Sequence, residues 1–426
     1  MSFSSQKTAE LPEQLKRREP AMPTALAGVR VVDFTHFVAG PYATMMLADF
    51  GAEVIKIEKP GSGDSFRKYP PVDRRAPDSG APFLFCNRNK RSVVLDMKNS
   101  TGLRLAKELV RRADVLVENF STGVMNDYGL DYDACKELNP RLIYCSIPAY
   151  ARDGSHAARA GFDAVAQAES GYIESNGYDD RPGTRSFSPI MDISTGLVAC
   201  TTILAALNAR RDSGVGQYCE VALFDASLTM LGYAPMQYLL TGIEPKRNGN
   251  ASPDTSPSSV FSCSDASFYL NGGTDPIFRR LAIDVLESPS LLEDPRFSDL
   301  PGRIANREAL TDLLQHEFAK HPWRYWHARF ERASVPCGKV KTMPEALAGP
   351  EVLGRGSICR IPHPELDWIP DIRPAARMSG TPVADAVAAP TLGQHTKAVM
   401  REVFEASADE LAALAAAGAF GAKPPI

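Results

Sequence analysis

Several patterns that mark common classes of protein are missing from this sequence. Lysine and arginine (47) do not outnumber aspartate and glutamate (51), and the formal net charge is −4. Such a chain has no basic excess with which to neutralise a nucleic-acid backbone or an anionic membrane surface. The longest apolar stretch, residues 196–207, is well short of the roughly 20 residues that span a bilayer. We therefore expect a buried helix there, and neither nucleic acid nor a membrane among the partners.

Signals for export and for metal binding are also missing. Residues 1–22 are mostly polar and lack the apolar segment of a secretory signal, so we interpret 1–23 as a flexible N-terminal tail. The eight cysteines form no Cys-x-x-Cys pair and no Cys/His cluster at metal-ligand spacing. His316, His321 and His327 lie close together in the sequence, but their spacing does not set them on one helix face. We expect a cytoplasmic protein with reduced thiols and no metal.

The first half of the chain alternates between short apolar segments and segments with helical periodicity. Strands are expected at 29–34, 53–58, 92–95, 114–118, 141–146 and 218–223, and helices at 41–50, 101–112 and 193–211. Alternating strands and helices with apolar, β-branched strands predict a parallel sheet covered by helices on both faces. The expected fold class is α/β, with a doubly wound, Rossmann-like large domain over residues 24–228.

The second half has a different composition. Residues 229–259 include a stretch rich in proline, serine and asparagine that is typical of a linker. A hairpin at 260–270 and helices at 276–286, 307–320 and 323–333 then predict a smaller α+β domain over 260–345. Residues 346–383, which are rich in proline from about residue 360, are interpreted as a return linker. The last segment, 384–426, is expected to form C-terminal helices that pack back on the large domain.

The loop after the first expected strand, residues 35–41, is a candidate anion-binding site. Helix N-terminal amides at such a loop commonly face an anionic ligand. The loop has a single glycine, Gly40, so the Gly-x-Gly-x-x-Gly fingerprint of dinucleotide-binding enzymes is absent. Glu58, at the end of the second expected strand, is placed like the ribose-binding acid of a dehydrogenase. Judged by Glu58 alone, an NAD-dependent enzyme is an alternative interpretation of the sequence.

Eight blocks, in a fixed order from about residue 26 to 404, resemble the family III CoA-transferases, a group that includes formyl-CoA transferase and carnitine CoA-transferase. The blocks are FTHFVAGPYATMMLADFGAEVIKIEKPGSGD (34–64), NKRSVVLDMK (89–98), ADVLVENF (113–120), LNPRLIYCSI (138–147), GFDAVAQAESG (161–171), MDISTG (191–196), GVGQYCEVALFDA (214–226) and LGQHT (392–396). The resemblance implies the fold of that family and an intertwined homodimer. It also implies an acyl-CoA donor and a carboxylic acid acceptor as substrates.

The resemblance identifies Asp192 as the nucleophilic carboxylate. From the residues alone, an Asp just before the helix expected at 193–211 is a typical N-cap, and the two roles are compatible. With an ordinary pKa of about 3.9 and a helix N-terminus beside it, we expect the carboxylate to stay ionised. The implied mechanism passes through an acyl-aspartyl mixed anhydride and an aspartyl-CoA thioester. It needs no permanently bound cofactor, since coenzyme A is a substrate.

The resemblance also places a set of residues along CoA. The lysines suit its phosphates, and Leu95 and Phe120 suit the adenine ring, with solvated lysines and core packing as the alternatives. The set is Phe37, Val38, Ala39, Lys59, Leu95, Lys98, Asn119 and Phe120. Asp127 and Ala160 stand where formyl-CoA transferase has basic residues. We therefore expect the phosphate contacts to be redistributed to Arg88, Lys90 or Arg91.

Oxyanion stabilisation is expected from backbone amides near Gly40 and in the loop that contains Gly272 and Gly273. That loop is less glycine-rich than the corresponding loop of formyl-CoA transferase. The difference disfavours oxalate and formyl-CoA as substrates and leaves small dicarboxylates, with succinyl-CoA or a similar donor. Arg181 and Arg185 are candidates to pair with a distal carboxylate, with a solvated surface role as the alternative.

The same family contains 2-methylacyl-CoA racemases, which carry a histidine in a Gly-His-Asp block. Here the block is Gly161-Phe162-Asp163, and phenylalanine cannot exchange a proton. This substitution favours a transferase, with the racemase as the alternative function. Asp163 is then a candidate to orient the substrate or the anhydride, or to make a structural hydrogen bond.

Overall fold

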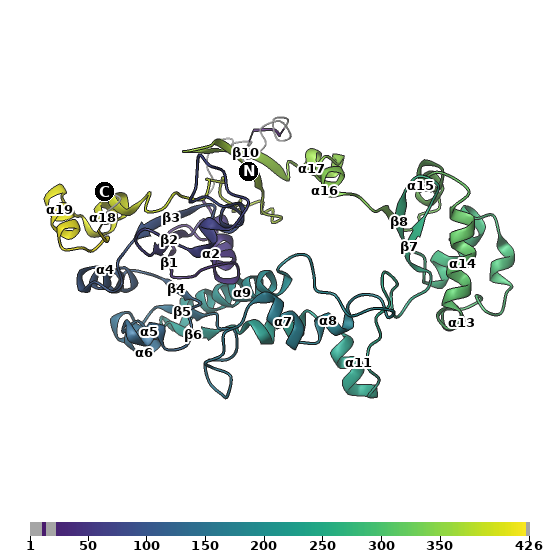
Figure 1. Ribbon diagram of the computed structural model, residues 1–426, viewed down its shortest axis with the longest axis horizontal. Helices are drawn as coiled ribbons and strands as arrows, with labels where there is room; N and C mark the ends of the chain where they lie inside the picture. The colour runs from purple at the N-terminus through teal and green to yellow at the C-terminus, as the bar shows by residue number, and fades with distance from the viewer. Residues whose placement is uncertain (1–10, 14–22, 423–426) are drawn as a thin grey trace. The chain divides into compact units, whose positions relative to one another are not determined.

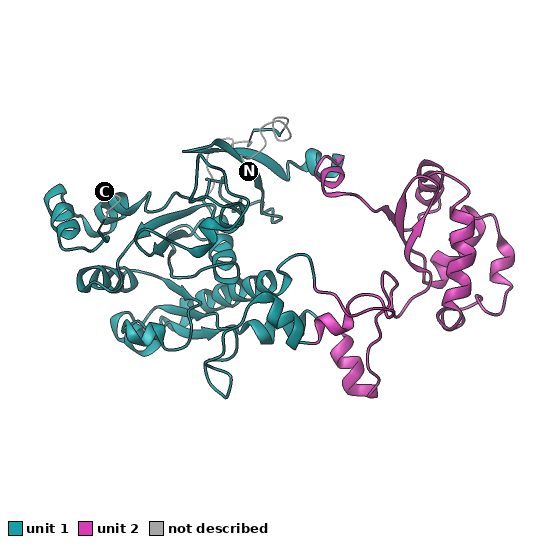
Figure 2. Cartoon of the chain, in the orientation of Figure 1, with its two compact units in different colours: residues 1–170, 186–232, 350–426 teal, residues 171–185, 233–349 magenta. Residues whose placement is uncertain are grey.

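The computed structural model describes residues 11–13 and 23–422 (Figure 1). Apart from residues 11–13 and 23, the tail expected over 1–23 therefore lies outside the described residues. The chain divides into two compact units (Figure 2). Unit 1 comprises residues 1–170, 186–232 and 350–426, and unit 2 comprises residues 171–185 and 233–349.

Unit 1 contains a six-stranded parallel sheet, which confirms the expected doubly wound fold. Its strand order is β3-β2-β1-β4-β5-β6. The strands are β1 (Arg30–Asp33), β2 (Glu53–Glu58), β3 (Lys90–Val94), β4 (Val115–Glu118), β5 (Ile143–Ser146) and β6 (Gln217–Glu220). The order reverses between β1 and β4, and in open sheets of this kind ligands bind at the carboxyl ends of the strands at such a point.

Helices cover both faces of the sheet because side chains alternate along each strand. Val31 of β1 belongs to one buried cluster, together with residues of α2 (Ala39–Asp49) and α9 (Ile190–Ser213). Val32 belongs to the opposite cluster, together with residues of α4 (Ser100–Arg111), α18 (Thr396–Phe404) and α19 (Ala408–Ala416). The C-terminal helices thus complete the core on one face of the sheet.

Shorter helices of unit 1 connect the strands. They are η1 (Ser65–Lys68), α3 (Ala81–Cys86), α5 (Val124–Asp127), α6 (Tyr132–Leu138), α7 (Asp163–Glu169), α10 (Leu223–Thr229) and α17 (Pro350–Arg355). Among the described helices, α9 is the one long and apolar enough to cross a membrane by length and composition. Core helices of soluble proteins pass the same test, and α9 packs Ala199, Cys200 and Ile203 into the core of unit 1.

Buried ion pairs lie at the carboxyl end of the sheet. Lys90 Nζ is 3.0 Å from Asp33 Oδ2, and Arg67 Nη2 is 2.6 Å from Glu58 Oε1. The side chains of both pairs are fully buried. Charges removed from water need partners at this distance, and removing one partner leaves an uncompensated charge. The Lys90 pair therefore fixes Asp33 at the end of β1, which carries the first loop, and the Arg67 pair fixes Glu58 at the end of β2.

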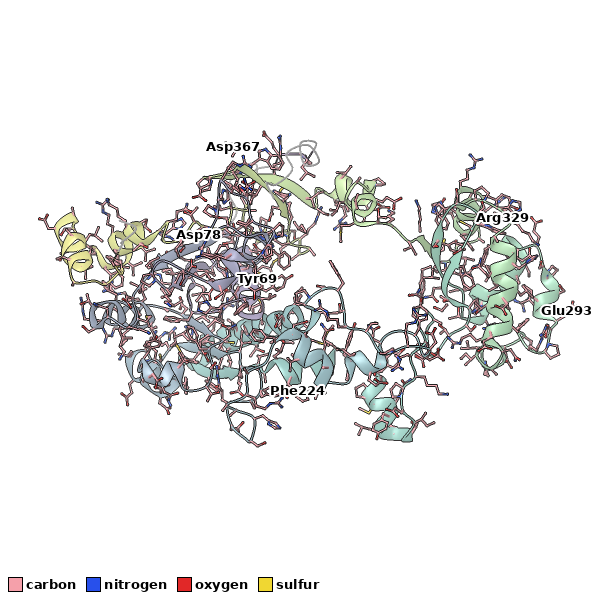
Figure 3. All side chains as sticks on the ribbon, in the orientation of Figure 1. Tyr69, Asp78, Phe224, Glu293, Arg329 and Asp367 are labelled. Atoms are coloured by element: carbon pink, nitrogen blue, oxygen red, sulfur yellow. The ribbon has the colours of Figure 1, made fainter. Side chains whose placement is uncertain are left out.

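Unit 2 is built around an antiparallel sheet of β7 (Ser258–Ser262), β8 (Ser267–Asn271) and β9 (Cys337–Lys339). Its core consists of aromatic side chains, with Phe268 and Phe318 in contact at 5.1 Å between ring centroids. In Figure 3, Arg329 and Glu293 mark this unit. Its helices are α8 (Tyr172–Ser175), α11 (Ala234–Thr241), α12 (Asp275–Arg280), α13 (Leu300–Ala305), α14 (Arg307–Phe318), α15 (Trp323–Arg332) and α16 (Met343–Leu347), with shorter turns at η2 (Leu281–Val285) and η3 (Pro289–Leu292).

Both segments expected to be linkers contain regular structure. Residues 229–259 include α11, and residues 346–383 include an antiparallel hairpin of β10 (Ile358–His363) and β11 (Asp367–Ile372). The hairpin belongs to unit 1, where Arg88 contacts it, with Nη1 3.3 Å from Asp371 Oδ1. Its prolines, Pro362 and Pro370, suggested a linker, but prolines are tolerated on edge strands such as these.

Candidate active site

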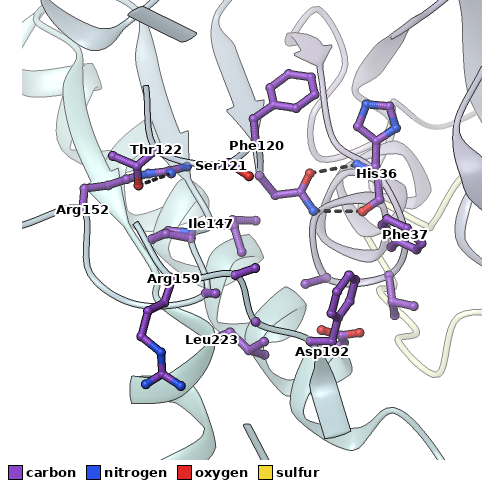
Figure 4. Close-up of a pocket in the computed structure, with 18 of the residues that line it drawn as sticks. His36, Phe37, Phe120, Ser121, Thr122, Ile147, Arg152, Arg159, Asp192 and Leu223 are labelled. Carbon is purple, nitrogen blue, oxygen red and sulfur yellow. Dashed lines mark hydrogen bonds between the residues drawn. The ribbon is translucent and has the colours of Figure 1, made fainter. Parts of the chain in front are cut away.

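The loop between β1 and α2 is held by side chains from neighbouring strands. The His36 N–H donates to Asn119 Oδ1 at 2.8 Å, and Asn119 Nδ2 donates to the His36 carbonyl at 2.9 Å (Figure 4). Lys56 Nζ donates to the Thr35 carbonyl at 2.6 Å. Within this frame Phe37 adopts a φ of 64°, in a region that non-glycine residues rarely occupy. Such a conformation persists where the surroundings enforce it, as at ligand-binding loops.

The start of α9 is held by α7. Asp163 Oδ1 accepts the N–H groups of Met191 at 2.8 Å and Asp192 at 3.2 Å. Gln167, one turn later on α7, donates to Asp163 Oδ2 at 2.5 Å and accepts the Ser186 N–H at 2.7 Å. The GFDAVAQ block therefore fixes the backbone on which Asp192 stands.

This arrangement corrects the expected N-cap role of Asp192. The helix begins at Ile190 rather than at 193, Pro189 is its N-cap, and Asp192 lies in the first turn. The capping acceptor is Asp163, which reaches the helix from another element. The side chain of Asp192 is thus left for other contacts.

Gly196 lets α9 approach α2 one turn beyond Asp192. A Cβ at this position would lie 2.8 Å from the Ala39 carbonyl oxygen and 3.2 Å from the Tyr42 ring. Side chains essentially never approach a backbone oxygen that closely, so any larger residue would push the helices apart. The glycine of the MDISTG block therefore brings Asp192 close to the N-terminus of α2.

A cavity of about 390 Å³ opens at this point of unit 1 (Figure 4). Its wall is formed by the first loop, by the segments that follow β4 and β5, and by Asp192. This is the place where the strand order reverses, at the carboxyl ends of β1 and β4. From the predicted set, the cavity brings together Phe37, Val38, Ala39, Asn119, Phe120 and Asp192.

Burial and a neighbouring charge change the expected ionisation of Asp192. Burial, and then the Asp163 carboxylate, raise the pKa of Asp192 from 3.8 to about 7. The sequence predicted an ordinary pKa, with the carboxylate fully ionised at neutral pH, and that prediction is wrong. Desolvation and a like charge both disfavour the charged form, and here they outweigh the helix N-terminus. Near neutral pH the ionised form of Asp192 is therefore less favoured than that of an ordinary aspartate.

The remaining predicted CoA contacts lie outside this cavity wall. Lys59 and Lys98 are exposed, just beyond the ends of β2 and β3. Leu95 has an exposed fraction of 0% and packs in the core cluster with α4. The Leu95 side chain thus packs in the core, as the alternative to adenine binding predicted. Gly40 lies in the first turn of α2, whose N-cap Val38 makes no side-chain capping bond.

The basic residues expected to take over the phosphate contacts are engaged in ion pairs, which corrects that expectation. Arg88 is bonded to Asp49 at 2.6 Å, and Lys90 to Asp33. Both side chains are buried, and Arg91 bridges Glu53 and Glu402, at 2.7 Å from each. None of the three lines the cavity.

Three residues differ from the patterns of related enzymes, Asp127 and Ala160 from formyl-CoA transferase and Phe162 from the racemases. Two of them lie at the cavity and one lies outside its wall. Ala160 and Phe162 both line the wall. Phe162 is 59% exposed, and its ring centroid is 5.7 Å from that of Phe37. Phe37 also contacts Tyr69, labelled in Figure 3, at 6.0 Å. Asp127 is exposed on α5.

The predicted residues of the glycine loop belong to unit 2. The Gly272 N–H donates to the Pro257 carbonyl at 2.8 Å. The Gly273 carbonyl accepts from the buried Arg303 at 2.8 Å. Arg181 is exposed and paired with Asp180 at 2.8 Å, and Arg185 is also exposed. The contacts of Arg181 fit the solvated alternative.

The cavity wall contains residues that the sequence did not single out. His36, Ser121, Thr122, Arg152 and Arg159 line it. Arg152 donates to Glu118, to Ser146 and to Thr122, and Arg159 pairs with Glu169. Three of them could have been found from the sequence by their position alone. His36, Ser121 and Arg152 follow the ends of β1, β4 and β5, where ligands bind in such sheets. Within residues 11–13 and 23–422, no group of three or more His, Cys, Asp or Glu side chains could hold a metal ion.

Comparison with known proteins agrees with this geometry. The pattern of CoA-transferase family III matches residues 26–396. Succinate–glutarate CoA-transferase of Agrobacterium fabrum is 36% identical over 382 residues, which cover 89% of this chain and 95% of that one. Acetyl-CoA:oxalate CoA-transferase of Acetobacter aceti is 37% identical over 343 residues, which cover 80% and 87%.

The fold has counterparts among solved structures. The crystal structure of a CAIB/BAIF family protein from Brucella suis matches with a TM-score of 0.80 and 36% sequence identity, covering 89% of this chain and 100% of that one. The resemblance that the eight sequence blocks carry is therefore confirmed. The chain belongs to CoA-transferase family III and is a CoA-transferase.

Proposed function

We propose that this enzyme moves CoA from an acyl-CoA donor to a carboxylic acid acceptor, with Asp192 as the covalent nucleophile. The observation that carries the proposal is that Asp192 lines a cavity at the switch point of the sheet, whose wall also includes Val38 and Ala39 at the N-terminus of α2. A carboxylate there meets an electrophile under positive potential from the helix. The names of the two relatives above, both CoA-transferases, support the reaction type.

In the first step, a carboxylate oxygen of Asp192 attacks the thioester carbonyl carbon of the donor. The C–S bond breaks, CoA leaves as the thiolate, and an acyl-aspartyl anhydride remains. The thiolate then attacks the aspartyl carbonyl, which releases the donor acid and leaves an aspartyl-CoA thioester. Thioester energy is conserved in each covalent intermediate, so the steps require neither ATP nor a permanently bound cofactor.

The acceptor carboxylate then attacks the aspartyl thioester carbonyl and displaces CoA. This gives the anhydride between Asp192 and the acceptor acid. In the last step the CoA thiolate attacks the acceptor acyl carbon, which forms the new acyl-CoA and returns the Asp192 carboxylate. Each step has an oxyanion, for which the first-turn amides of α2, including that of Gly40, are the proposed donors. Val38 caps α2 without a side-chain bond, which supports their availability.

For the remainder of CoA we propose a path from the first loop toward Lys59 and Lys98, with Phe120 beside the adenine ring. Both lysines are exposed at the carboxyl edge of the sheet, and Phe120 lines the cavity. For the acids we propose small dicarboxylates, because the Agrobacterium relative is named for succinate and glutarate. A cytoplasmic location is part of the proposal, and the eight unpaired cysteines support it.

We also propose that the protein is a homodimer of intertwined chains. On α11, Leu239 is 75% and Leu240 is 78% exposed, and none of the residues of this helix is buried. Apolar surface of this kind on a soluble chain usually marks an interface. A second copy is the proposed partner.

One observation favours the racemase alternative. A carboxyl with a pKa of about 7 is suited to general acid–base catalysis. Racemisation needs a second proton-exchanging group across the substrate carbon, and the position where racemases of this family carry a histidine is occupied by Phe162. The transferase is therefore the function that we propose first.

One experiment separates the two functions. The purified protein is incubated in D₂O with acyl-CoA donors and free acids, and the acyl-CoA products are measured by mass spectrometry. We expect new acyl-CoA species that disappear in Asp192→Ala and persist in Asp225→Ala, which removes an exposed first-turn carboxylate from α10. Deuterium at the α-carbon without exchange of CoA between acids would instead establish the racemase.

A further inference from the structure

The phosphates of CoA need positive partners that the structure leaves accessible. Arg88 and Lys90 are buried in ion pairs, and Arg91 is shared between two glutamates. At the cavity itself, Arg152 and Arg159 are paired with glutamates at 2.8 and 2.5 Å. His36, the other basic side chain in the described cavity wall, lies farther from its nearest carboxylate, with Nδ1 3.7 Å from Asp64 Oδ1.

His36 stands at the boundary between the cavity and a buried carboxylate. Its side chain is 24% exposed, and its ring lies 5.2 Å from that of Phe120. Its Nδ1 is 3.7 Å from Asp64 Oδ1, too far for a hydrogen bond but close enough for charge attraction. Although burial would raise it, Lys56 and then His36 hold the pKa of Asp64 below its usual range. Asp64 therefore presents a negative charge to the imidazole.

The order of the strands aligns His36 with the exposed lysines. The loop after β1 carries His36, and the segments after β2 and β3 carry Lys59 and Lys98. Because β3, β2 and β1 are neighbours in the sheet, the three basic residues follow one another along its carboxyl edge. Figure 4 shows His36 and Phe120 apart from Asp192. A CoA thioester with its carbonyl at Asp192 must carry its phosphates away from that residue.

We propose that the imidazole of His36 is a phosphate-binding group for CoA, at the point where the ligand leaves the cavity toward Lys59 and Lys98. The inference rests on the proposed function and adds a residue that the sequence blocks did not identify as a contact. In the proposed complex His36 lies between the Asp64 carboxylate on one side and the ligand phosphates on the other. The charged groups packed around it are Asp64 and, through Asp64, Lys56.

The test is calorimetric binding of CoA and of pantetheine, which lacks the phosphates, to the full-length protein. We expect His36→Gln to weaken CoA binding about tenfold, as for loss of one hydrogen bond to a charged group, while pantetheine binding stays the same. His36→Arg restores a positive charge and should bind CoA within about threefold of the wild type. CoA binding by His36→Gln should also depend less steeply on salt, because one ionic contact is missing.

Equal weakening of both ligands would show that His36 only supports the loop, and would overturn the proposal. Unchanged CoA affinity, or an unchanged salt dependence in His36→Gln, would also overturn it. These outcomes differ from failure of the proposed function. A wild-type protein that binds no CoA would refute the function itself. A wild-type protein that catalyses CoA transfer, with a His36→Gln variant that binds CoA equally well, would refute only the phosphate contact.

Discussion

Asp163 both orders Asp192 and opposes its ionisation. The Oδ1 atom of Asp163 accepts the Asp192 N–H at 3.2 Å, so it fixes the first turn of α9. After burial, the charge of Asp163 is the second cause that raises the pKa of Asp192 to about 7. One carboxylate thus keeps the backbone of the proposed nucleophile in place and leaves the charge of its ionised form poorly stabilised, which would raise the reactivity of that form.

The first prediction concerns the pH dependence of the transfer reaction. In Asp163→Asn the amide oxygen can still accept the Met191 and Asp192 N–H groups, while the bond from Gln167 Nε2 to the second oxygen is lost. The negative charge is also gone, so the pKa of Asp192 should fall. Because the ionised carboxylate is the proposed nucleophile, kcat/KM should reach its plateau at lower pH than in the wild type. Initial rates between pH 5 and 9 measure this. An unchanged profile would show that Asp163 exerts no charge effect.

The second prediction concerns stability. The folded pKa of Asp192, about 7, lies above its ordinary value of 3.8, so ionisation opposes folding as the pH rises from 4 toward 8. Asp192→Asn removes that group. Its melting temperature should exceed that of the wild type by a margin that grows from pH 5 to pH 8 and then levels off. A margin independent of pH would contradict the raised pKa.

The third prediction concerns the contact between α9 and α2. Gly196→Ala should lower activity and stability, although alanine normally favours a helix by about 1 kcal/mol, because its Cβ meets the Ala39 carbonyl at 2.8 Å. Gly354→Ala is the matched control, since nothing lies within 4 Å of a Cβ at that helical position. We expect the control to be neutral or stabilising. Thermal melting and transfer rates of both variants would test this.

The fourth prediction separates a structural arginine from a ligand-binding one. Arg88→Met leaves Asp49 and Asp371 buried without their partner, so we expect a loss of about 3 to 5 kcal/mol in the free energy of unfolding. Chemical denaturation measures it. The folded fraction should bind CoA as the wild type does. If the folded variant instead binds CoA more weakly than the wild type, Arg88 contacts the CoA phosphates, as the sequence first suggested.

The fifth prediction concerns assembly. Leu239→Glu introduces a charge on the exposed apolar face of α11, and it should convert the proposed dimer into monomers. Analytical ultracentrifugation would measure the mass. Arg324→Glu changes an exposed residue of α15 and serves as the control. A wild-type monomer, or a Leu239→Glu dimer, would contradict the proposed interface.

The sheet could be predicted because its signal is local. The strand expected at 53–58 has the same bounds as β2, and the other five overlap their predicted ranges. β-branched residues buried on both faces produce that signal in the sequence itself. The hairpin of β10 and β11 escaped prediction because Pro362 and Pro370 resemble the prolines of a connector, although its two strands pair locally, with His363 opposite Asp367.

The chemistry of the site was less predictable, because it depends on partners distant in sequence. The resemblance identified Asp192, but its cap comes from Asp163, 29 residues earlier on another helix. Its raised pKa depends on burial and on that same neighbour. Likewise, Arg88 and Lys90 are ordinary basic residues in the sequence. Their acceptors, Asp49 and Asp33, become partners only when the strands and α2 assemble.

The state of the cysteines has a consequence for a catalyst whose cargo is itself a thiol. Burial raises the pKa of Cys86 and of Cys200 to about 12, and Cys200 stands on the same helix as Asp192. At neutral pH these thiols are essentially all protonated, and a protonated thiol is a poor nucleophile. Neither can capture the acyl group of the proposed anhydride as a dead-end thioester. In the proposed mechanism the sulfur that attacks Asp192 is then supplied by the substrate.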